Sequence, residues 1–305
     1  MARMLISASR RTDIPAFYSE WFFNRLSEGY SLARNPMNPS QVSKIPLTPD
    51  VTDGIIFWTK NPTPMLSRLN ELCNFEYAFQ FTITPYDTDV EPHIPDKHKV
   101  IIPAFKQLSN LIGAERISWR YDPVFLSERY NFAYHIRAFT QLCAELQGYV
   151  RRVTISFMVV YRSITHNIAM LQAHNDRNEQ MRLAAEFLKI AQSHGLELYA
   201  CCDSDVLAIG ISHASCIDGT VFGLNIPRDK NQRDGCNCSA SADIGEYATC
   251  LHGCRYCYAN HSDAAVAAKS AAHNVNSPLL TGVLRDGDTV KERNAISYRT
   301  SQSEL

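Results

Sequence analysis

The first two-thirds of the chain alternates short runs of β-branched and aromatic residues with longer runs of helical hydrophobic periodicity. The short runs predict six strands, at residues 5–9, 54–59, 77–84, 116–121, 153–159 and 196–200. The longer runs predict helices at residues 15–28, 62–72, 101–112, 132–146 and 180–193, most of which end at a glycine. Strands that alternate with helices favour β/α units and a parallel sheet.

Six β/α units predict an α/β fold, a partial (β/α)6 TIM-like barrel over residues 1–202. A doubly wound sheet is the alternative, but no glycine-rich phosphate loop follows the first predicted strand. Residues 203–275 form a cysteine-rich segment that we expect to bind a cluster, with an alanine-rich helix at 261–272. Residues 276–305 are predicted to be a partly irregular arm. A bound metal would explain how the long loop at 209–243 is held.

Each predicted strand ends in polar residues, and the active site of a β/α barrel is built at that end. We assign the charged residues to catalysis, and the four basic ones among them also to binding an anionic substrate group. These are Arg10, Arg11, Asp13, Lys60, Arg120 and Asp122. The neutral candidates, for cofactor binding, are Thr82, Thr84 and Ser156. The alternative is structural, with Arg120 paired to Asp122 and Lys60 as a charge on the rim.

Composition narrows the classes of function. The chain has 305 residues, with 30 Lys and Arg against 31 Asp and Glu, and its net charge is −1. This balance argues against a large nucleic-acid interface. The first residues are too poor in apolar side chains for a secretory signal, and no apolar run approaches the length of a membrane span. We therefore expect a cytoplasmic protein with no membrane partner.

Cysteine is concentrated near the carboxy end, where a role as metal ligand is favoured over disulfides because the cytosol keeps thiols reduced. Cys250, Cys254 and Cys257 have the spacing C-x3-C-x2-C. Three such thiolates can hold three irons of a [4Fe–4S] cluster and leave the fourth iron open. This is the arrangement of the radical S-adenosylmethionine (SAM) enzymes. The alternative is a zinc site whose fourth ligand is His252 or a remote cysteine.

Five more cysteines in this region can form a second metal site. Cys236 and Cys238, with Cys216 and one of Cys201 and Cys202, can supply four thiolates. Four thiolates would saturate a second iron–sulfur cluster or a zinc ion. The alternative is that these cysteines are reduced bystanders.

Five strings spread along the chain resemble DUF1848, a family of uncharacterised bacterial proteins whose carboxy-terminal cysteines are similar to the radical SAM motif. The strings are Ser-Arg-Arg-Thr-Asp-Ile-Pro at 9–15, Phe-Trp-Thr-Lys-Asn-Pro at 57–62, Trp-Arg-Tyr-Asp-Pro at 119–123, Asn-Gln-Arg at 231–233 and the cysteine run at 250–260. The resemblance implies a cytoplasmic iron–sulfur protein and indicates no substrate.

A broader resemblance is to the radical SAM superfamily. It implies that the three motif cysteines bind the cluster, that the open iron chelates SAM, and that Tyr256 lies near the adenine. Asn260, together with the threonines and the serine at the strand ends, is a further candidate for holding SAM. The chain departs from the superfamily because six β/α units precede the motif, so the barrel is circularly permuted or the arm folds over its mouth. It also lacks a Gly-Gly-Glu string.

The leading hypothesis is a radical SAM enzyme. It would cleave SAM reductively to a 5′-deoxyadenosyl radical that acts on an unknown, anionic substrate, with electrons from a flavodoxin- or ferredoxin-type donor. One alternative is a non-catalytic iron–sulfur protein for electron transfer or redox sensing. The other is a zinc protein with cysteine ligands, such as a barrel hydrolase.

Overall fold

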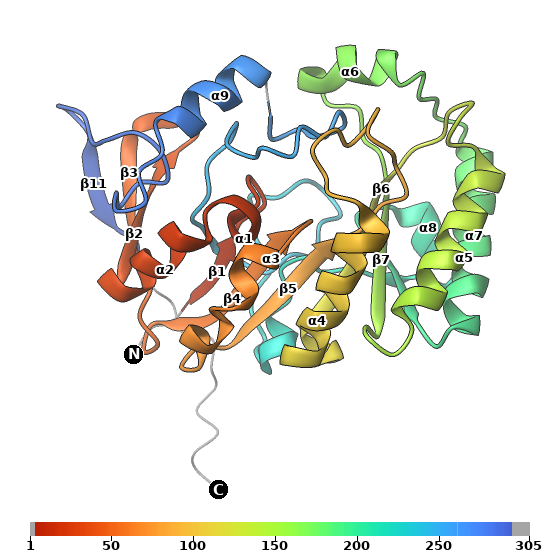
Figure 1. The fold of residues 1–305 in the computed structure, drawn as a ribbon, viewed down its shortest axis with the longest axis horizontal. Helices are drawn as coiled ribbons and strands as arrows, with labels where there is room; N and C mark the ends of the chain where they lie inside the picture. Colours follow the sequence, from red (N-terminus) through yellow and green to blue (C-terminus); the bar gives the residue numbers. More distant parts are fainter. Residues whose placement is uncertain (1–3, 261, 295–305) are drawn as a thin grey trace, which may run out of the picture.

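A parallel sheet forms the centre of the protein (Figure 1). The computed structural model describes residues 4–260 and 262–294. The sheet has eight strands, which lie side by side in the order β10-β1-β4-β5-β6-β7-β8-β9. Their bounds are β1 Met4–Ala8, β4 Thr52–Thr59, β5 Tyr77–Thr82, β6 Ile117–Val124, β7 Arg152–Phe157, β8 Glu197–Ala200, β9 Ser212–His213 and β10 Ala242–Asp243.

The strands from β1 to β8 run in chain order and correspond to the six strands predicted from the sequence. This order fits successive β/α units, whereas a doubly wound sheet reverses its strand order at a switch point. The mixed α/β class and the parallel sheet are therefore confirmed. A closed TIM-like barrel is not, because within the described residues β9 and β10 are the edges of the sheet and do not pair with each other.

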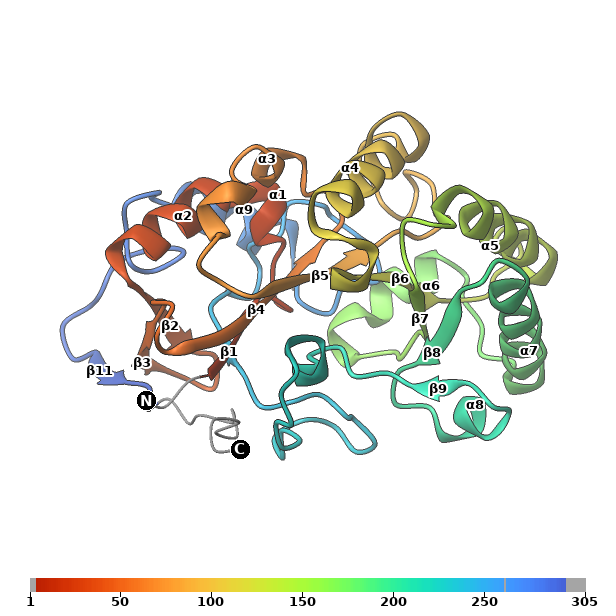
Figure 2. The ribbon, with the colours of Figure 1, turned by 90° about the horizontal axis from the view of Figure 1, so that it is seen from below.

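The helices α4, α5 and α7 lie outside the arc that the strands follow (Figure 2). The α-helices are α1 Ile14–Phe17, α2 Ser19–Glu28, α3 Thr63–Leu66, α4 Ile102–Ile112, α5 Phe132–Leu146, α6 Thr165–Met170, α7 Arg177–Ser193, α8 Ser204–Ala208 and α9 Asp263–Ala271. The shorter helical turns are η1 Leu69–Leu72, η2 Lys97–Ile101, η3 Ala114–Arg116, η4 Arg162–Ile164 and η5 Gly219–Phe222.

Two predicted helices are each divided in the structure. The one expected at 15–28 is interrupted at Tyr18, whose φ of −134° is not helical. The Tyr18 hydroxyl donates a hydrogen bond to the carbonyl of the distant Thr249 at 2.6 Å. The helix expected at 62–72 becomes α3 and η1. Helices α6 and α8 were not predicted, because each is only about one turn long.

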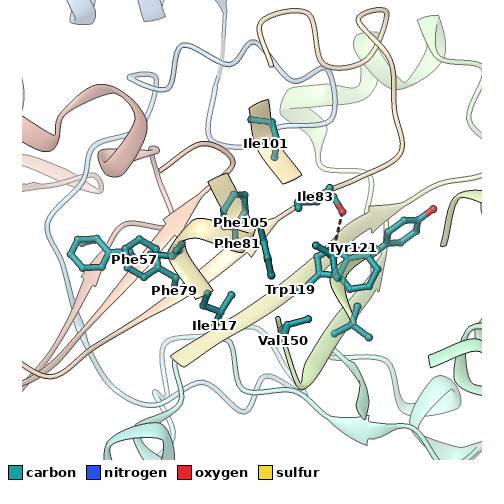
Figure 3. Close-up of a cluster of buried hydrophobic side chains, with 14 of the residues drawn as sticks. Phe57, Phe79, Phe81, Ile83, Ile101, Phe105, Ile117, Trp119, Tyr121 and Val150 are labelled. Atoms are coloured by element: carbon teal, nitrogen blue, oxygen red, sulfur yellow. Dashed lines mark hydrogen bonds between the residues drawn. The ribbon is translucent and has the colours of Figure 1, made fainter. Parts of the chain in front are cut away.

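One face of the sheet packs on the helices through apolar side chains at alternate positions (Figure 3). The rings of Phe57 and Phe79 stack with their centroids 4.8 Å apart. Trp119 stacks on Phe139 of α5 at 5.4 Å. The indole nitrogen of Trp119 donates to the carbonyl of Ile83 at 3.0 Å, so the polar atom of this buried ring is satisfied.

The opposite face of the sheet is polar towards the ends of the central strands. Its side chains there are Gln80 and Thr82 of β5, Ser118 and Arg120 of β6, and Thr154 and Ser156 of β7. Nearer β1 and β4 this face is apolar and packs on the cysteine-rich segment. A Cβ atom at Gly54 would lie 2.5 Å from the ring of Phe222, so glycine permits the close approach of η5 to β4.

A second, three-stranded sheet was not predicted. Strands β2 (Tyr30–Asn35) and β3 (Asn38–Pro46) form an antiparallel hairpin, and β11 (Thr289–Glu292) pairs with β3 in parallel. All four residues of β11 and the first four of β3 are exposed, and the buried residues of β2 are consecutive. These strands therefore lack the alternation that marks a half-buried strand. In the predicted arm, Leu279 and Leu280 are buried, and residues 295–305 lie outside the described part.

None of the helices in the described part of the chain combines the length and the apolar character that crossing a membrane requires.

The edges of the central sheet, β9 and β10, both belong to the predicted cysteine-rich segment. The part of this segment between residues 212 and 243 therefore begins and ends at a strand of the sheet.

Candidate functional site

Polar residues at the carboxyl ends of the strands line a cavity of about 1010 Å³. In open α/β sheets ligands bind at this end. Most of the predicted site residues line it, namely Arg10, Arg11, Asp13, Lys60, Thr82, Arg120, Asp122, Ser156, Cys201, Cys216, Cys236, Cys238, Cys250, Cys254, Tyr256 and Cys257. Thr84, Cys202 and Asn260 do not line it. A cavity of about 550 Å³ beside Arg129 and Arg255 contains none of the predicted site residues.

The loop that carries the three motif cysteines is held by other parts of the chain. The backbone N–H of Arg255 donates to the carbonyl of Val90 at 2.9 Å, which attaches the loop to the segment after β5. The Asn260 side chain donates to the carbonyl of Cys250 at 2.8 Å and closes the loop on itself. Gly253 has a φ of +67°, a left-handed conformation that favours glycine. The cysteines are thereby presented to the cavity by a supported loop.

The three motif thiols lie in an environment that disfavours negative charge in the absence of a cation. Burial raises the pKa of Cys254 to about 12, although the Lys60 ammonium opposes the shift. Burial also raises the pKa of Cys250 and of Cys257, and at Cys250 the nearby Asp13 and the other two thiols add to the shift. Binding of a metal would therefore release protons from these thiols.

Neither cysteine group is already arranged as a coordination site. Across residues 4–260 and 262–294, no group of three or more His, Cys, Asp and Glu side chains has a metal-binding arrangement. Cysteine reorients by rotation about a single χ1 torsion between staggered rotamers. Metal binding at either group thus requires side chains to turn.

A buried carboxylate, Glu91, organises the wall of the cavity beside the motif. Lys60 Nζ donates to one of its oxygens at 2.7 Å, and Lys97 Nζ lies 2.6 Å from the other. Thr84 donates to Glu91 at 2.7 Å, and the Tyr256 hydroxyl donates to it as well. Burial by itself raises the pKa of Glu91, but the two ammonium groups outweigh burial and lower it to about 2.

This network gives several predicted residues their surroundings. Lys60 is not an exposed rim charge, because Glu91 pairs with it and its ammonium lies 5.5 Å from the ring centre of Tyr256. Burial lowers the pKa of Lys60, and the negative charges of Glu91 and Cys254 outweigh burial and raise it. The ammonium is therefore a fixed positive charge beside the motif. The role of Tyr256 towards an adenine stays a prediction.

Asp13 connects the start of the chain to the motif loop. One of its oxygens accepts from the backbone N–H of Ala16 at 3.0 Å and caps α1. The other accepts from the backbone N–H of Lys60 and from Nε2 of His252, each at 2.7 Å. Nδ1 of His252 is buried and forms no hydrogen bond with any described residue. The contacts of Asp13 are those of a positioning residue, and a direct part in catalysis stays a prediction.

We expect Asp13→Ala to lower the free energy of unfolding by about 2–4 kcal/mol, as the sum of a lost helix cap and of buried donors left without an acceptor. Urea denaturation measures this change. Asp96→Ala is the matched control, because exposed Asp96 caps η2 and has no contact with the motif loop. Amide hydrogen exchange at residues 250–257 should accelerate only in Asp13→Ala. Equal exchange in both variants would contradict the positioning role.

The five cysteines of the possible second site also meet. The Cys201 sulfur lies 3.8 Å from that of Cys216, although 14 residues separate them in sequence. Arg120 Nη1 donates to the Cys216 sulfur at 3.0 Å, and the same guanidinium forms an ion pair with Asp122. Arg120 thus faces the second cysteine group. Its predicted contact with an anionic substrate is not tested by this geometry.

The remaining candidates lie around the opening of the cavity. Arg10 Nη1 donates to the side chain of Gln232 at 2.9 Å. Arg11 Nη1 donates to the carbonyl of Gly245 at 3.3 Å. Thr82 and Ser156 line the cavity from β5 and β7. Both arginines keep further guanidinium N–H groups that a ligand can use, since each carries five donors.

Two central residues, Glu91 and His252, were not assigned a catalytic or cofactor role from the sequence. Glu91 lies in the segment after β5, and nothing in its neighbours distinguishes it from an exposed acid. His252 was considered only as a zinc ligand. Glu91 comes four residues after Asp87, which already lies beyond the end of a predicted strand. An acidic residue in such a loop is too common a pattern to indicate a buried ion pair.

Comparison with known proteins places this site within a described family. A family model described as "Domain of unknown function (DUF1848)" matches residues 5–259. The match includes every predicted site residue except Asn260. No curated protein matches the chain significantly. The resemblance carried by the five strings is thereby confirmed for the family, and the radical SAM relationship stays a prediction. The chain belongs to the DUF1848 family.

Proposed function

We propose that this protein is a [4Fe–4S] enzyme of the radical SAM type, which cleaves SAM reductively and acts on a substrate bound in the cavity. The observation that carries the proposal is the convergence of Cys250, Cys254 and Cys257 on the cavity that Lys60 and Arg10 also line. When bound by three thiolates, a four-iron cluster keeps one iron for SAM and supplies the electron for its cleavage.

The donor set fits such a cluster in its chemistry. Thiolates are the ligands that iron–sulfur clusters take, and the motif loop offers three of them. The cavity of about 1010 Å³ lies at the upper end of the range for small-molecule sites. It therefore has room for SAM and for part of a substrate. A non-catalytic electron carrier needs no such cavity, which favours the enzyme over that alternative.

The chain's own residues would bind, orient and balance charge. Lys60 supplies a positive charge next to three thiolates, and Glu91 holds the ammonium in place. Asp13 and His252 keep the motif loop against the first β/α unit. Arg10 and Arg11 offer guanidinium donors to an anionic group of the substrate. Electrons would come from a flavodoxin- or ferredoxin-type donor.

A zinc protein is the second candidate, and one observation favours it. Nε2 of His252 donates to the Asp13 carboxylate, while Nδ1 is buried without a hydrogen bond to any described residue. Metal-binding histidines commonly donate their other ring N–H to a carboxylate in this way. His252 with the three motif cysteines would complete a four-ligand zinc site and leave no position for SAM.

Electron paramagnetic resonance of the anaerobically reconstituted, reduced protein separates the two candidates. We expect the signal of a reduced [4Fe–4S] cluster, and we expect its g-values to change when SAM is added, because the open iron gains ligands. A cluster signal that SAM leaves unchanged would support an electron carrier. Stable zinc at the motif, without iron uptake, would support the zinc protein.

A further inference from the structure

The sulfurs of five cysteines that lie far apart in the sequence come together beside the cavity. The Cys201 sulfur is 3.5 Å from that of Cys202 and 3.8 Å from that of Cys216. Cys238 also has side-chain interactions with Cys216 and with Cys236, and Cys236 has one with Cys202. These pairs connect the five cysteines into a closed ring. Apolar packing alone has no need of such a ring, because any small hydrophobic residues would serve.

The surroundings of the ring suit thiolates bound to a cation. Cys216, Cys236 and Cys238 are only 5%, 5% and 3% exposed. Two guanidinium groups nevertheless reach the sulfurs, since Arg120 Nη1 is 3.0 Å from Cys216 and Arg233 Nη2 is 3.7 Å from Cys201. Guanidinium donors stabilise negative charge. Because Arg120 is also paired with Asp122, the two positive charges offset only part of the net charge of −2 that a divalent ion with four thiolates carries.

The spacing of the sulfurs favours a single ion over a second cluster. Around tetrahedral zinc, a metal–sulfur distance of about 2.3 Å places neighbouring sulfurs about 3.8 Å apart. The sulfurs of Cys201 and Cys216, which lie 3.8 Å apart, already have this separation. A four-iron cluster holds its cysteine sulfurs further apart, because each sulfur binds a different iron. We propose that Cys201, Cys216, Cys236 and Cys238 bind one zinc ion as a closed structural site.

Cys202 is the fifth member of the ring, and the geometry assigns it no place in the ligand set. The four proposed ligands line the cavity, and Cys202 does not. The Cys201 sulfur contacts that of Cys216, one of the most buried of the five, whereas Cys202 has a left-handed backbone φ of +53° and points to Cys236. Cys201 is therefore assigned as a ligand, and its neighbour Cys202 serves as the control for substitutions in the ligand set.

The zinc site would link the two open edges of the sheet. Cys201 follows β8, Cys216 follows β9, and Cys236 and Cys238 precede β10. In the described residues β9 and β10 do not pair, so no hydrogen-bonded ladder connects the edges. The segment between them runs along the inner side of the arc (Figure 2). A four-coordinate ion would stabilise this segment, since metal binding adds directly to folding free energy.

Metal analysis of the full chain with Cys250→Ser, Cys254→Ser and Cys257→Ser combined tests the proposal independently of the first site. We expect about one zinc ion per chain and no iron after purification. X-ray absorption at the zinc edge should give four sulfur neighbours at about 2.3 Å. Iron with sulfide in place of zinc, or a chain with all seven remaining thiols free and no metal, would overturn the zinc site.

Two further variants in that background test the ligand set. Cys216→Ala should retain less than about a tenth of the zinc, since a four-ligand site loses one donor. Cys202→Ala should retain zinc in full. Loss of zinc in Cys202→Ala with retention in Cys201→Ala would overturn the assignment. If Cys216→Ala does not fold, X-ray absorption at the zinc edge of the protein with the three motif cysteines replaced by serine still decides the number of sulfur ligands.

Discussion

Replacing Cys254 by alanine is expected to abolish cluster assembly and all cleavage of SAM. Cys254 is one of three thiols on the motif loop, and it lines the cavity. Burial disfavours its thiolate form, whereas the nearby Lys60 ammonium favours it. With two thiolates left, a four-iron cluster has too few protein ligands to be retained. Iron content after anaerobic reconstitution, and 5′-deoxyadenosine formed with dithionite, are the measurements.

Cys73→Ala is the matched control for this experiment, because Cys73 is exposed and lies at the end of η1 outside the cavity. It should keep the iron content and the SAM cleavage of the unaltered protein. Full cluster absorbance in Cys254→Ala would refute the assignment of the motif. If Cys254→Ala loses iron but the unaltered protein never cleaves SAM, the motif binds a cluster and the proposed enzyme activity is wrong.

Replacing Glu91 by glutamine should cause a large loss of stability. The side chain of Glu91 is 1% exposed and faces the ammonium groups of Lys60 and Lys97. Glutamine has the same shape but no charge, so two buried cations lose their counter-charge. Breaking a buried ion pair in this way costs about 3–5 kcal/mol. Urea denaturation at neutral pH measures the difference in unfolding free energy.

The same pair of proteins predicts a pH dependence. The pKa of Glu91 falls from 4.5 to about 2 on folding. A carboxyl group with a lowered folded-state pKa contributes stability that is present above its unfolded pKa and is lost as pH falls through the folded value. The advantage of the unaltered protein over Glu91→Gln should therefore shrink between pH 4.5 and about 2. A difference that is constant over this interval would contradict the ion-pair account.

Glu71→Gln is the control for Glu91→Gln. Glu71 forms an ion pair with Arg68 on the surface, and the two side chains are 42% and 35% exposed. Solvent screens such a pair, so we expect a change of less than about 1 kcal/mol. A similar loss in both variants would mean that burial does not set the strength of the Glu91 pairs.

The central β/α units could be predicted because each carries its own signal. The strand at 54–59 is a continuous apolar run, and α5 has a helical apolar stripe that ends before Gly148. The hairpin β2–β3 and strand β11 could not be predicted. The buried residues of β2 are consecutive, β3 begins with four exposed residues and β11 is exposed throughout, so none of the three shows the alternation of a half-buried strand. The break of the first helix at Tyr18 has no local breaker residue, and the Tyr18 hydroxyl bonds the distant Thr249 carbonyl.

The sequence indicated which residues line the site more reliably than it indicated the contacts that these residues make. For Arg120 the sequence offered a substrate anion or a pair with Asp122; the structure has the pair with Asp122 and adds a contact with Cys216 that was not foreseen. Lys60 was expected to bind an anion or to be an exposed charge on the rim, and it pairs with buried Glu91. Cys216 and Glu91 lie tens of residues from Arg120 and Lys60, where no periodicity reports on distance. Long-range ion pairs leave no local pattern, because they depend on how segments meet.

By itself, the amino-acid order determined the parallel β/α succession, the polar strand ends and the grouping of thiols near the carboxy end. These follow from hydrophobic periodicity and from residue chemistry, which are local properties of a chain. Only the tertiary structure decided that the sheet stays open in its described part, that Asp13 and His252 bind each other, and that five sulfurs form a ring. Those features arise where distant segments pack, and burial at these places changes the pKa values of the ionisable groups and the strength of their interactions.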